Sequence, residues 1–447
     1  MKYLRCLLAL LLGLVLFAAA AIAYFETPIR MPGDGRFAVL AADSLIHQGN
    51  LELSEYPEAR LSGTPREIRR DADGEIWLAP PIGAAVLAVP VVAIAERSLL
   101  KRAARFLEVH DYVANRNFGS KLPAMPTPPK IQDLRPFLDG AAAAAIAAAA
   151  VVLLFWLAWL RAGWLAALVT AILLAFGTSL LTSVGKSLWP QGAALLALAA
   201  ALLCLEAGRT RKVLVGIAGL PLAFAWVCGP DQLPVIFCLL LYVAFHERAQ
   251  ALRVLGWSLP VLLPFVLDTW LHKGVLVAPG YGFPLPEGGS YGEALLAHWF
   301  STSRGLLVFS PFLPLAFATL AKGTRSRLFA LDAWALLGAL TFGAIVAFDG
   351  WWWHGHGFGA RAMTPALALV TLPLALAVAR GLDRARQKRP LLLGFVLALG
   401  GFAIAVHFKA AVALEPWAWC ATPVSIDDQH DRLWSLTDPQ VLAGFLR

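Results

Sequence analysis

The sequence has little charge. Asp, Glu, Lys and Arg make up 15% of its 447 residues, against about 25% in soluble domains. Hydrophobic residues make up 59%, where ~45–50% is usual. This balance excludes an ordinary soluble protein. The chain carries 37 Lys and Arg against 29 Asp and Glu, but the cations sit in short clusters between apolar runs. That pattern is typical of membrane topology and argues against a nucleic-acid partner.

The sequence also lacks cysteine pairs and nucleotide motifs. Four of the five cysteines lie in or beside apolar runs, and only Cys420 lies in a polar stretch. No disulfide framework or CxxC metal site follows from this distribution. A GxxxxGK[ST] phosphate loop is absent from the sequence, and the basic linkers between apolar runs are too short for a nucleotide-binding domain. ATP-driven transport by this chain alone is therefore excluded.

Long apolar runs are abundant and set the fold class. About 20 apolar residues in a helix cross a bilayer. Runs of this kind begin near residues 4, 137, 163, 188, 252, 304, 328, 362 and 391, and two shorter runs cover 213–228 and 232–247. We therefore predict an all-α polytopic membrane protein with about 11 transmembrane helices. Its expected parts are a first transmembrane helix (1–25), a large external loop (26–136), a bundle of about ten helices (137–408) and a short external tail (409–447).

The basic residues predict the orientation of these helices. The run at 79–95 is short and contains three prolines. If it does not cross the membrane, most of the basic linkers fall on the same side as Lys2 and Arg5, as the positive-inside rule requires. We therefore interpret it as re-entrant or interfacial, with the amino terminus cytoplasmic. The small residues near Ala20 also admit a cleaved signal peptide, but the first apolar run exceeds the usual ~7–15 residues, so an anchor is favoured.

Two features follow the first apolar run. The segment from Gly35 to Gln48 has apolar residues at helical spacing and predicts an amphipathic helix lying on the membrane. Just before it, Asp34 stands between two glycines. A carboxylate partly desolvated at a membrane surface has a raised pKa and suits general-base catalysis. Asp34 is equally suited to capping the helix that follows, and both interpretations stay open.

The linker at 349–361 has the most unusual composition. It holds three consecutive tryptophans, including Trp352, together with His354, His356, several glycines and Arg361. An interfacial aromatic belt explains the tryptophans but not the glycines or Arg361. An arginine at the head of an apolar helix suits bidentate binding of a phosphate. The two histidines lack a nearby third ligand, so a metal site is not favoured.

The other external linkers add polar residues on the same side. Residues 186–191 contain Lys186, Trp189 and Gln191, and residues 272–304 contain Tyr281 and end at Arg304. Each cation on its own is equally explained by snorkelling toward lipid headgroups. Because three cations at helix ends accompany Asp34, we predict a site for an anionic substrate.

The order of these motifs resembles the GT-C superfamily of integral-membrane glycosyltransferases, which use polyprenyl-phosphate sugars. The matching features are the acid after the first span, the proline-glycine segment at 80–83, the Gly280-Tyr281 turn, the run from Ser303 to Pro311 and the stretch from Trp352 to Arg361. Bacterial members of the superfamily also share the tail patterns Arg432-Leu433-Trp434 and Asp438-Pro439-Gln440. Protein O-mannosyltransferases, aminoarabinose transferases and arabinofuranosyltransferases belong to this group.

The resemblance implies a bacterial inner-membrane enzyme with its active site on the external, periplasmic face. It implies transfer of a hexose or a pentofuranose such as arabinose from a polyprenyl-phosphate donor to a protein, lipid or glycan hydroxyl. Asp34 would be the base, Arg361, Arg304 and Lys186 would bind the donor phosphate, and His354, His356, Tyr281, Trp189, Gln191 and Trp352 would bind substrate. No cofactor is expected beyond the donor and membrane lipid.

Three departures from the superfamily and one alternative function accompany this expectation. Relatives often have a second acid where this chain has Gly35, and a histidine where it has Pro190-Gln191. An acid pair or a metal-assisted mechanism is therefore not expected. The arginine-proline turn of relatives appears here as Gly229-Pro230. The alternative is a transporter or flippase, for which Asp268 and Asp332 are the main candidate residues.

Overall fold

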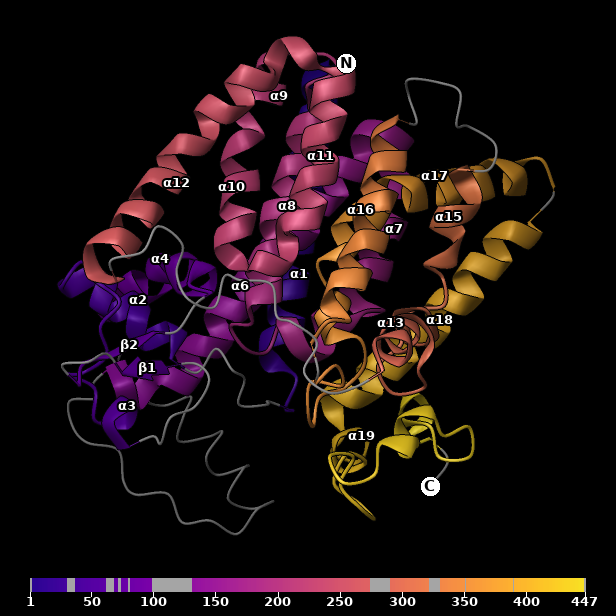
Figure 1. Cartoon of the computed structure of the whole chain (residues 1–447). Helices are drawn as coiled ribbons and strands as arrows, with labels where there is room; N and C mark the ends of the chain where they lie inside the picture. The colour runs from indigo at the N-terminus through magenta and orange to yellow at the C-terminus, as the bar shows by residue number, and fades with distance from the viewer. Residues whose placement is uncertain are drawn as a thin grey trace.

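The computed structural model describes residues 2–29, 37–61, 68–70, 74–78, 81–98, 131–273, 290–320, 330–349, 351–388 and 390–445. These residues are mostly helical, and the sheet they contain is one antiparallel pair of short strands. Figure 1 shows a bundle of long helices with smaller elements gathered at one end. The predicted helical fold is confirmed, and it is compatible with an all-α membrane protein.

Six helical segments are long and apolar enough to cross a membrane by length and composition: Cys6–Glu26, Leu134–Ala162, Pro190–Ala207, Arg248–Trp270, Ala366–Arg386 and Leu391–Val412. Shorter apolar helices of the described chain include Trp164–Phe176, Val213–Cys228, Pro230–His246 and Ala330–Val346. All of these coincide with apolar runs identified in the sequence. The count of eleven spans stays a prediction.

The first half of the bundle is built around α6 (Ile131–Ala162), which contacts α1 (Lys2–Glu26), α7 (Trp164–Phe176) and α8 (Pro190–Ala207). The alanine-rich stretch of α6 from 141 to 150 is largely buried in these contacts. Small side chains allow helix backbones to approach closely where no hydrophobic force drives association in lipid. Between α7 and α8 the chain makes one π-helical turn, η1 (Leu180–Val184).

The second half begins with short helices and ends with long ones. Its elements are α9 (Val213–Ile217), α10 (Gly219–Cys228), η2 (Pro230–Gln232), α11 (Leu233–His246), η3 (Arg248–Gln250), α12 (Ala251–Lys273), α13 (Tyr291–Phe300), α14 (Leu306–Phe309), α15 (Pro314–Leu320), α16 (Ala330–Val346), η5 (Arg361–Met363), α17 (Ala366–Arg386) and α18 (Leu391–Val412). Among these, α17 is the most enclosed, because it contacts α6, α7, α8, α15, α16 and α18.

The apolar run beginning near residue 304 does not form one spanning helix. The structure has α14 and then α15, separated by the stretch at 310–313. Pro311 and Pro314 lack the backbone N–H that a continuous helix needs, and Pro314 instead occupies the first position of α15. The expected helix at this place is therefore corrected to two short helices within the described residues.

The first loop forms a small packed unit from α2 (Ala38–His47), α3 (Pro57–Leu61), β1 (Ile68–Arg70), β2 (Ile76–Leu78) and α4 (Gly83–Ser98). The strands pair in the register Ile68 with Leu78. The helix predicted after Asp34 is confirmed as α2. However, its residues 38–44 are buried against α4 and α6, so α2 forms part of a protein core. The run at 79–95 contributes α4, a helix too short to be among the six segments of spanning length.

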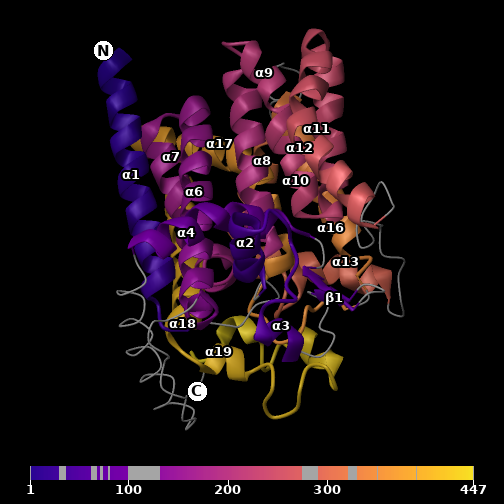
Figure 2. The same cartoon turned by 90° about the vertical axis from the view of Figure 1, so that its left-hand side faces the viewer.

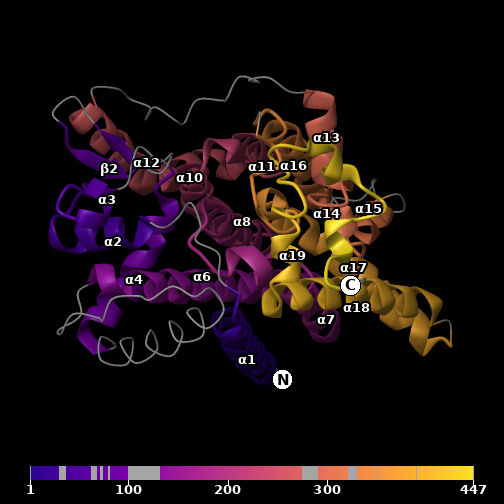
Figure 3. The same ribbon diagram turned by 90° about the horizontal axis from the view of Figure 1, so that it is seen from below.

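The tail consists of α19 (Glu415–Ala418), η6 (His430–Trp434) and η7 (Gln440–Leu442). Figures 1 and 2 place the tail and the first-loop unit at the end of the bundle opposite the amino terminus. Viewed from that end, α2 and α3 lie to one side and the tail to the other (Figure 3). The first-loop unit and the tail therefore lie at the same end of the bundle.

A charged cluster stabilises the other end of the bundle. The guanidinium of Arg161 donates to both oxygens of Glu206, at 2.9 and 2.5 Å, and to Oδ2 of Asp332 at 3.0 Å. The side chains of Glu206 and Asp332 are buried, and that of Arg161 is 9% exposed. A buried charge is tolerated only when it is paired and hydrogen-bonded. The cluster therefore ties α6, α8 and α16 together.

Candidate functional site

The linker between α16 and α17 has a strained backbone with a defined shape. His354, Gly355 and Gly359 have φ angles of 52°, 62° and 65°, which is the left-handed region that side chains other than glycine rarely occupy. At Gly355 a Cβ atom would also lie 2.7 Å from the ring of Trp351. Glycine is therefore required at this position for both its backbone angle and its size.

Arg304 holds this linker in place. Its Nε donates to the carbonyl of Trp353 at 2.6 Å, and its Nη2 donates to the carbonyl of Gly355 at 2.7 Å. Nη1 donates to the carbonyl of Ser303 at 2.7 Å and to Oε1 of Gln440 at 2.6 Å.

The remaining Arg304 N–H faces Sγ of Cys420, with Nη2 and Sγ 3.8 Å apart. A guanidinium has five N–H donors, so in this structure all of them are directed at protein acceptors. Burial lowers the pKa of Arg304, an effect that the neighbouring Cys420 opposes. Arginine nevertheless stays protonated at neutral pH.

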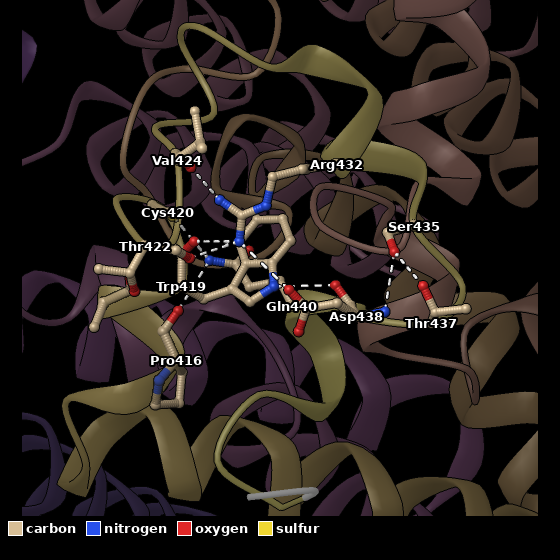
Figure 4. Close-up of polar contacts among 11 residues, drawn as sticks. Pro416, Trp419, Cys420, Thr422, Val424, Arg432, Ser435, Thr437, Asp438 and Gln440 are labelled. Atoms are coloured by element: carbon tan, nitrogen blue, oxygen red, sulfur yellow. Dashed lines mark hydrogen bonds and ion pairs between the residues drawn. The ribbon is translucent and has the colours of Figure 1, made fainter.

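The tail folds onto the same linker. The guanidinium of Arg432 lies over the ring of Trp419 at 4.5 Å and donates to the carbonyls of Trp419, Thr422 and Val424. Figure 4 shows this arginine at the centre of the tail. Nε2 of Gln440 donates to the carbonyls of Pro416 and Gly357 at 3.1 and 3.0 Å. Gln440 thus connects the tail, the linker and Arg304.

A pocket lies between this linker and α13. It is lined by His298, Arg304, Trp352, Trp353, His354, Gly357, Gly359, Ala360, Arg361 and Ala362, with about 250 Å³ of empty space including its open mouth. Arg361 sits at the start of η5, and its guanidinium carbon lies 3.5 Å from the ring centre of Trp189. Stacking of this kind fixes the plane of the guanidinium and leaves its edge directed along that plane.

The loop that carries Trp189 is anchored by a buried carboxylate. Asp139 of α6 accepts hydrogen bonds from Oγ of Ser187 and the backbone N–H of Leu188, both at 2.8 Å. Nearby, the buried ammonium of Lys186 donates to the side-chain hydroxyl and the carbonyl of Thr27 at the end of α1. The end of the first span and the 184–190 loop are therefore joined directly.

His298 of α13 also lines the pocket. It is 1% exposed, and its Nε2 has no hydrogen-bond partner among the described residues. Burial lowers its pKa to about 4, against the opposing effect of a hydrogen bond to the backbone of Val346. The imidazole is therefore neutral at pH 7. Its ring lies beside those of His354 and Trp352, with centres 6.0 and 6.3 Å away.

Of the ten site residues suggested by the sequence, the structure brings four together in one pocket. Arg361, Arg304, His354 and Trp352 line one pocket, and Trp189 reaches it by stacking on Arg361. Lys186 and Gln191 flank Trp189 in the chain, and Oε1 of Gln191 is buried without a hydrogen-bond partner among the described residues. Asp34 and Tyr281 lie outside the described residues.

His356 differs from the other predicted residues. Its Nε2 lies 3.1 Å from Oγ of Ser425 and 3.3 Å from a carboxylate oxygen of Asp427, both in the tail. It is exposed and absent from the pocket lining. Within the described chain, no group of three or more His, Cys, Asp or Glu side chains is arranged to hold a metal ion.

Two residues of this region were not singled out as site residues from the sequence. His298 is one histidine on a short apolar helix, which gives no signal by itself. Gln440 belongs to a tail pattern noted above, but nothing in the sequence pairs it with Arg304. Comparison with known proteins finds no matching family model, no matching curated protein and no matching solved structure.

Proposed function

We propose that the chain is a membrane glycosyltransferase. It moves a sugar, a hexose or a pentofuranose, from a polyprenyl-phosphate donor to a hydroxyl of a protein, lipid or glycan. The proposed location is a bacterial inner membrane, with the amino terminus in the cytoplasm and the site on the external face. The resemblance of the motif order to the GT-C superfamily supports this proposal, together with the chemistry of the pocket.

The observation that carries the proposal is the position of Arg361. Its guanidinium lies flat on Trp189, at a pocket lined by two histidines and two indole rings, at the start of an apolar helix. A guanidinium binds phosphate oxygens through paired N–H donors. Aromatic rings beside it suit the apolar faces of a sugar or an isoprene unit. A phosphate joining a sugar to a lipid requires both kinds of contact in one place.

The proposed chemistry is a single displacement. Asp34 takes the proton of the acceptor hydroxyl. The oxygen of that hydroxyl forms a bond to the anomeric carbon of the sugar, and the configuration at this carbon is inverted. The bond from the anomeric carbon to the phosphate oxygen breaks, and polyprenyl phosphate leaves with the electron pair. Arg361 stabilises the charge that develops on this phosphate. Because the leaving group is a weak base, a general acid is not required.

The proposed donor also has a long apolar tail. An apolar cavity of about 210 Å³ lies between α10, α11 and α12, with Leu222, Trp226, Ile236 and Leu262 among its lining residues. Such a cavity has the chemistry of an isoprenoid chain, which forms no hydrogen bonds. We propose that part of the donor tail occupies it.

The transporter alternative has less support. It depends on ionisable residues placed within the spans, of which Asp332 was a main candidate. Asp332 is bound by Arg161 next to Glu206, in a cluster that joins three helices. A carboxylate held by a buried partner has a structural role that already explains its presence. This leaves Asp268 as the remaining candidate of that pair.

The test is donor turnover by the purified, reconstituted protein. A panel of polyprenyl-phosphate sugars is supplied with a candidate acceptor extract, and release of polyprenyl phosphate is measured by mass spectrometry. We expect wild-type turnover to collapse in Asp34→Asn while donor binding is retained. The matched control is Asp428→Asn, which changes an exposed tail acid and should keep full activity.

Two outcomes would contradict parts of this proposal. Equal turnover by Asp34→Asn and the wild type would remove Asp34 as the base. Donor binding without any turnover, combined with movement of the lipid-linked sugar across the bilayer, would favour transport over transfer.

A further inference from the structure

His298 presents an unused acceptor to the pocket. The imidazole ring forms a hydrogen bond to the backbone of Val346. Its Nε2 has no hydrogen-bond partner among the described residues. The bonded nitrogen is therefore Nδ1. This bond fixes the tautomer, because a neutral imidazole that donates through Nδ1 carries its lone pair on Nε2. Nε2 is thus the polar atom that His298 offers to the pocket it lines.

A buried nitrogen acceptor of this kind destabilises the folded protein unless it receives a hydrogen bond. A buried polar group without a partner loses its hydrogen bonds to water and destabilises the protein by about 1–3 kcal/mol. Buried groups of this kind are uncommon in folded proteins and each needs an explanation. His298 is 1% exposed, so bulk water does not satisfy it in this structure. A ligand with a hydroxyl donor would.

The space beside the ring fits one such group. The pocket as a whole has room for about one water molecule. A hydroxyl group is of similar size.

We propose that His298 accepts a hydrogen bond from one hydroxyl of the donor sugar and thereby selects which sugar reacts. The inference rests on the proposed glycosyltransferase function and identifies the residue that discriminates between donor sugars. The rings of Trp352 and His354 lie beside that of His298, with centres 6.3 and 6.0 Å away, and the hydrogen bond to the backbone of Val346 fixes the direction in which Nε2 accepts. A sugar lacking that hydroxyl leaves Nε2 buried and unbound, which is how polar sites reject analogues.

The experiment pairs protein variants with deoxy sugars. His298→Phe keeps the ring and removes both nitrogens, and His298→Gln keeps an acceptor at the end of the side chain. The matched control is His407→Phe. His407 is equally buried and its Nε2 also lacks a partner among the described residues, but it is bonded to Thr182 and does not line the pocket.

Turnover is measured with the reactive donor and with its monodeoxy forms. We expect the wild type to prefer the full donor over one deoxy form by about tenfold in kcat/KM, the size of one hydrogen bond. That preference should vanish in His298→Phe, return in part in His298→Gln and remain in His407→Phe. A preference that is the same in the wild type and both His298 variants would overturn the inference while leaving the transferase function intact.

A binding arm separates the two proposals if the wild type shows no turnover. Binding of polyprenyl phosphate and of its sugar-bearing forms is followed by tryptophan fluorescence, since Trp352 and Trp353 line the pocket. The sugar-bearing lipid should bind more tightly than the bare lipid to the wild type but not to His298→Phe. If the wild type binds both lipids equally, or if His298→Phe keeps the difference, His298 does not read the sugar.

Discussion

The guanidinium of Arg304 donates to the side-chain amide oxygen of Gln440 at 2.6 Å, across 136 residues of sequence. Arg304 is 3% exposed and Gln440 is fully buried. Their bond joins the linker in front of α14 to the tail. Because Arg304 also binds two carbonyls of the tryptophan-rich linker, these three segments form one structural unit around the pocket.

Gln440→Ala should destabilise this unit. The substitution leaves one N–H of a buried guanidinium and the carbonyl of Pro416 without their partner, and it leaves the carbonyl of Gly357 with the weak thiol donor of Cys420. We expect a loss of about 2 kcal/mol in the free energy of unfolding, seen as a lower Tm of the purified protein in detergent. Gln387→Ala, at an exposed position, should leave the Tm unchanged. An unchanged Tm in Gln440→Ala would show that the tail does not stabilise the linker.

The free energy of unfolding should fall at acid pH, because His298 resists protonation in the folded protein. Its pKa is about 6.5 in the unfolded chain and about 4 in the folded one. The stabilisation from its neutral form is therefore complete above pH 6.5 and is lost as the pH falls to about 4, at ~1.4 kcal/mol per pH unit. Arg304 and Arg361 line the same pocket, and their positive charges oppose the protonation of His298.

The measurement for His298 is the Tm of wild type and His298→Phe between pH 7 and pH 4. The variant lacks the titrating group, so its Tm should decline less over this interval. Parallel declines in the two proteins would show that His298 does not titrate differently on folding.

Arg361 should affect turnover through both its charge and its shape. Arg361→Ala removes the phosphate contact and is expected to lower kcat/KM for the donor by about a hundredfold. Arg361→Lys keeps a charge but loses the paired donors and the stacking on Trp189, so a fall of about tenfold is expected. Arg384→Ala, at an exposed position later in α17, serves as the control. Equal activity of all three variants would place the donor phosphate elsewhere.

Arg161 should contribute to the stability of the folded protein and not to the chemistry of the external site. Arg161→Ala leaves the buried carboxylates of Glu206 and Asp332 facing each other without their shared cation. Loss of one partner from a buried ionic group costs about 3–5 kcal/mol. We expect a large drop in Tm or in the yield of folded protein. Arg211→Ala, an exposed cation near the same end, should behave as wild type, and a similar loss in both would point to membrane topology instead.

The sequence predicted the long helices well, because the bilayer determines both the length of apolar runs and the placement of basic linkers. It failed near residue 304, where Pro311 and Pro314 divide an apolar run into two short helices. It also placed α2 on the membrane surface, because helical spacing alone does not show which partner covers an apolar face. In the structure α4 and α6 cover it.

Four of the residues suggested by the sequence line the pocket, but the sequence did not separate what each of them does. Arg361 and Arg304 look alike in the sequence, as cations at helix ends. The structure separates them by position, because Arg304 lies in a network of carbonyls and Gln440, and Arg361 lies over the ring of Trp189. That distinction depends on carbonyls and on Gln440, which reach Arg304 only through the tertiary fold. The unpaired nitrogen of His298 is equally invisible without coordinates.

The bond between Arg304 and Gln440 also bears on biosynthesis. Gln440 is the 136th residue that a ribosome adds after Arg304, so α16, α17 and α18 are all synthesised before it. Until then the arginine has no side-chain amide to bind, and the tryptophan-rich linker lacks the tail that packs against it. The network that holds this linker beside the pocket is therefore completed only late in synthesis.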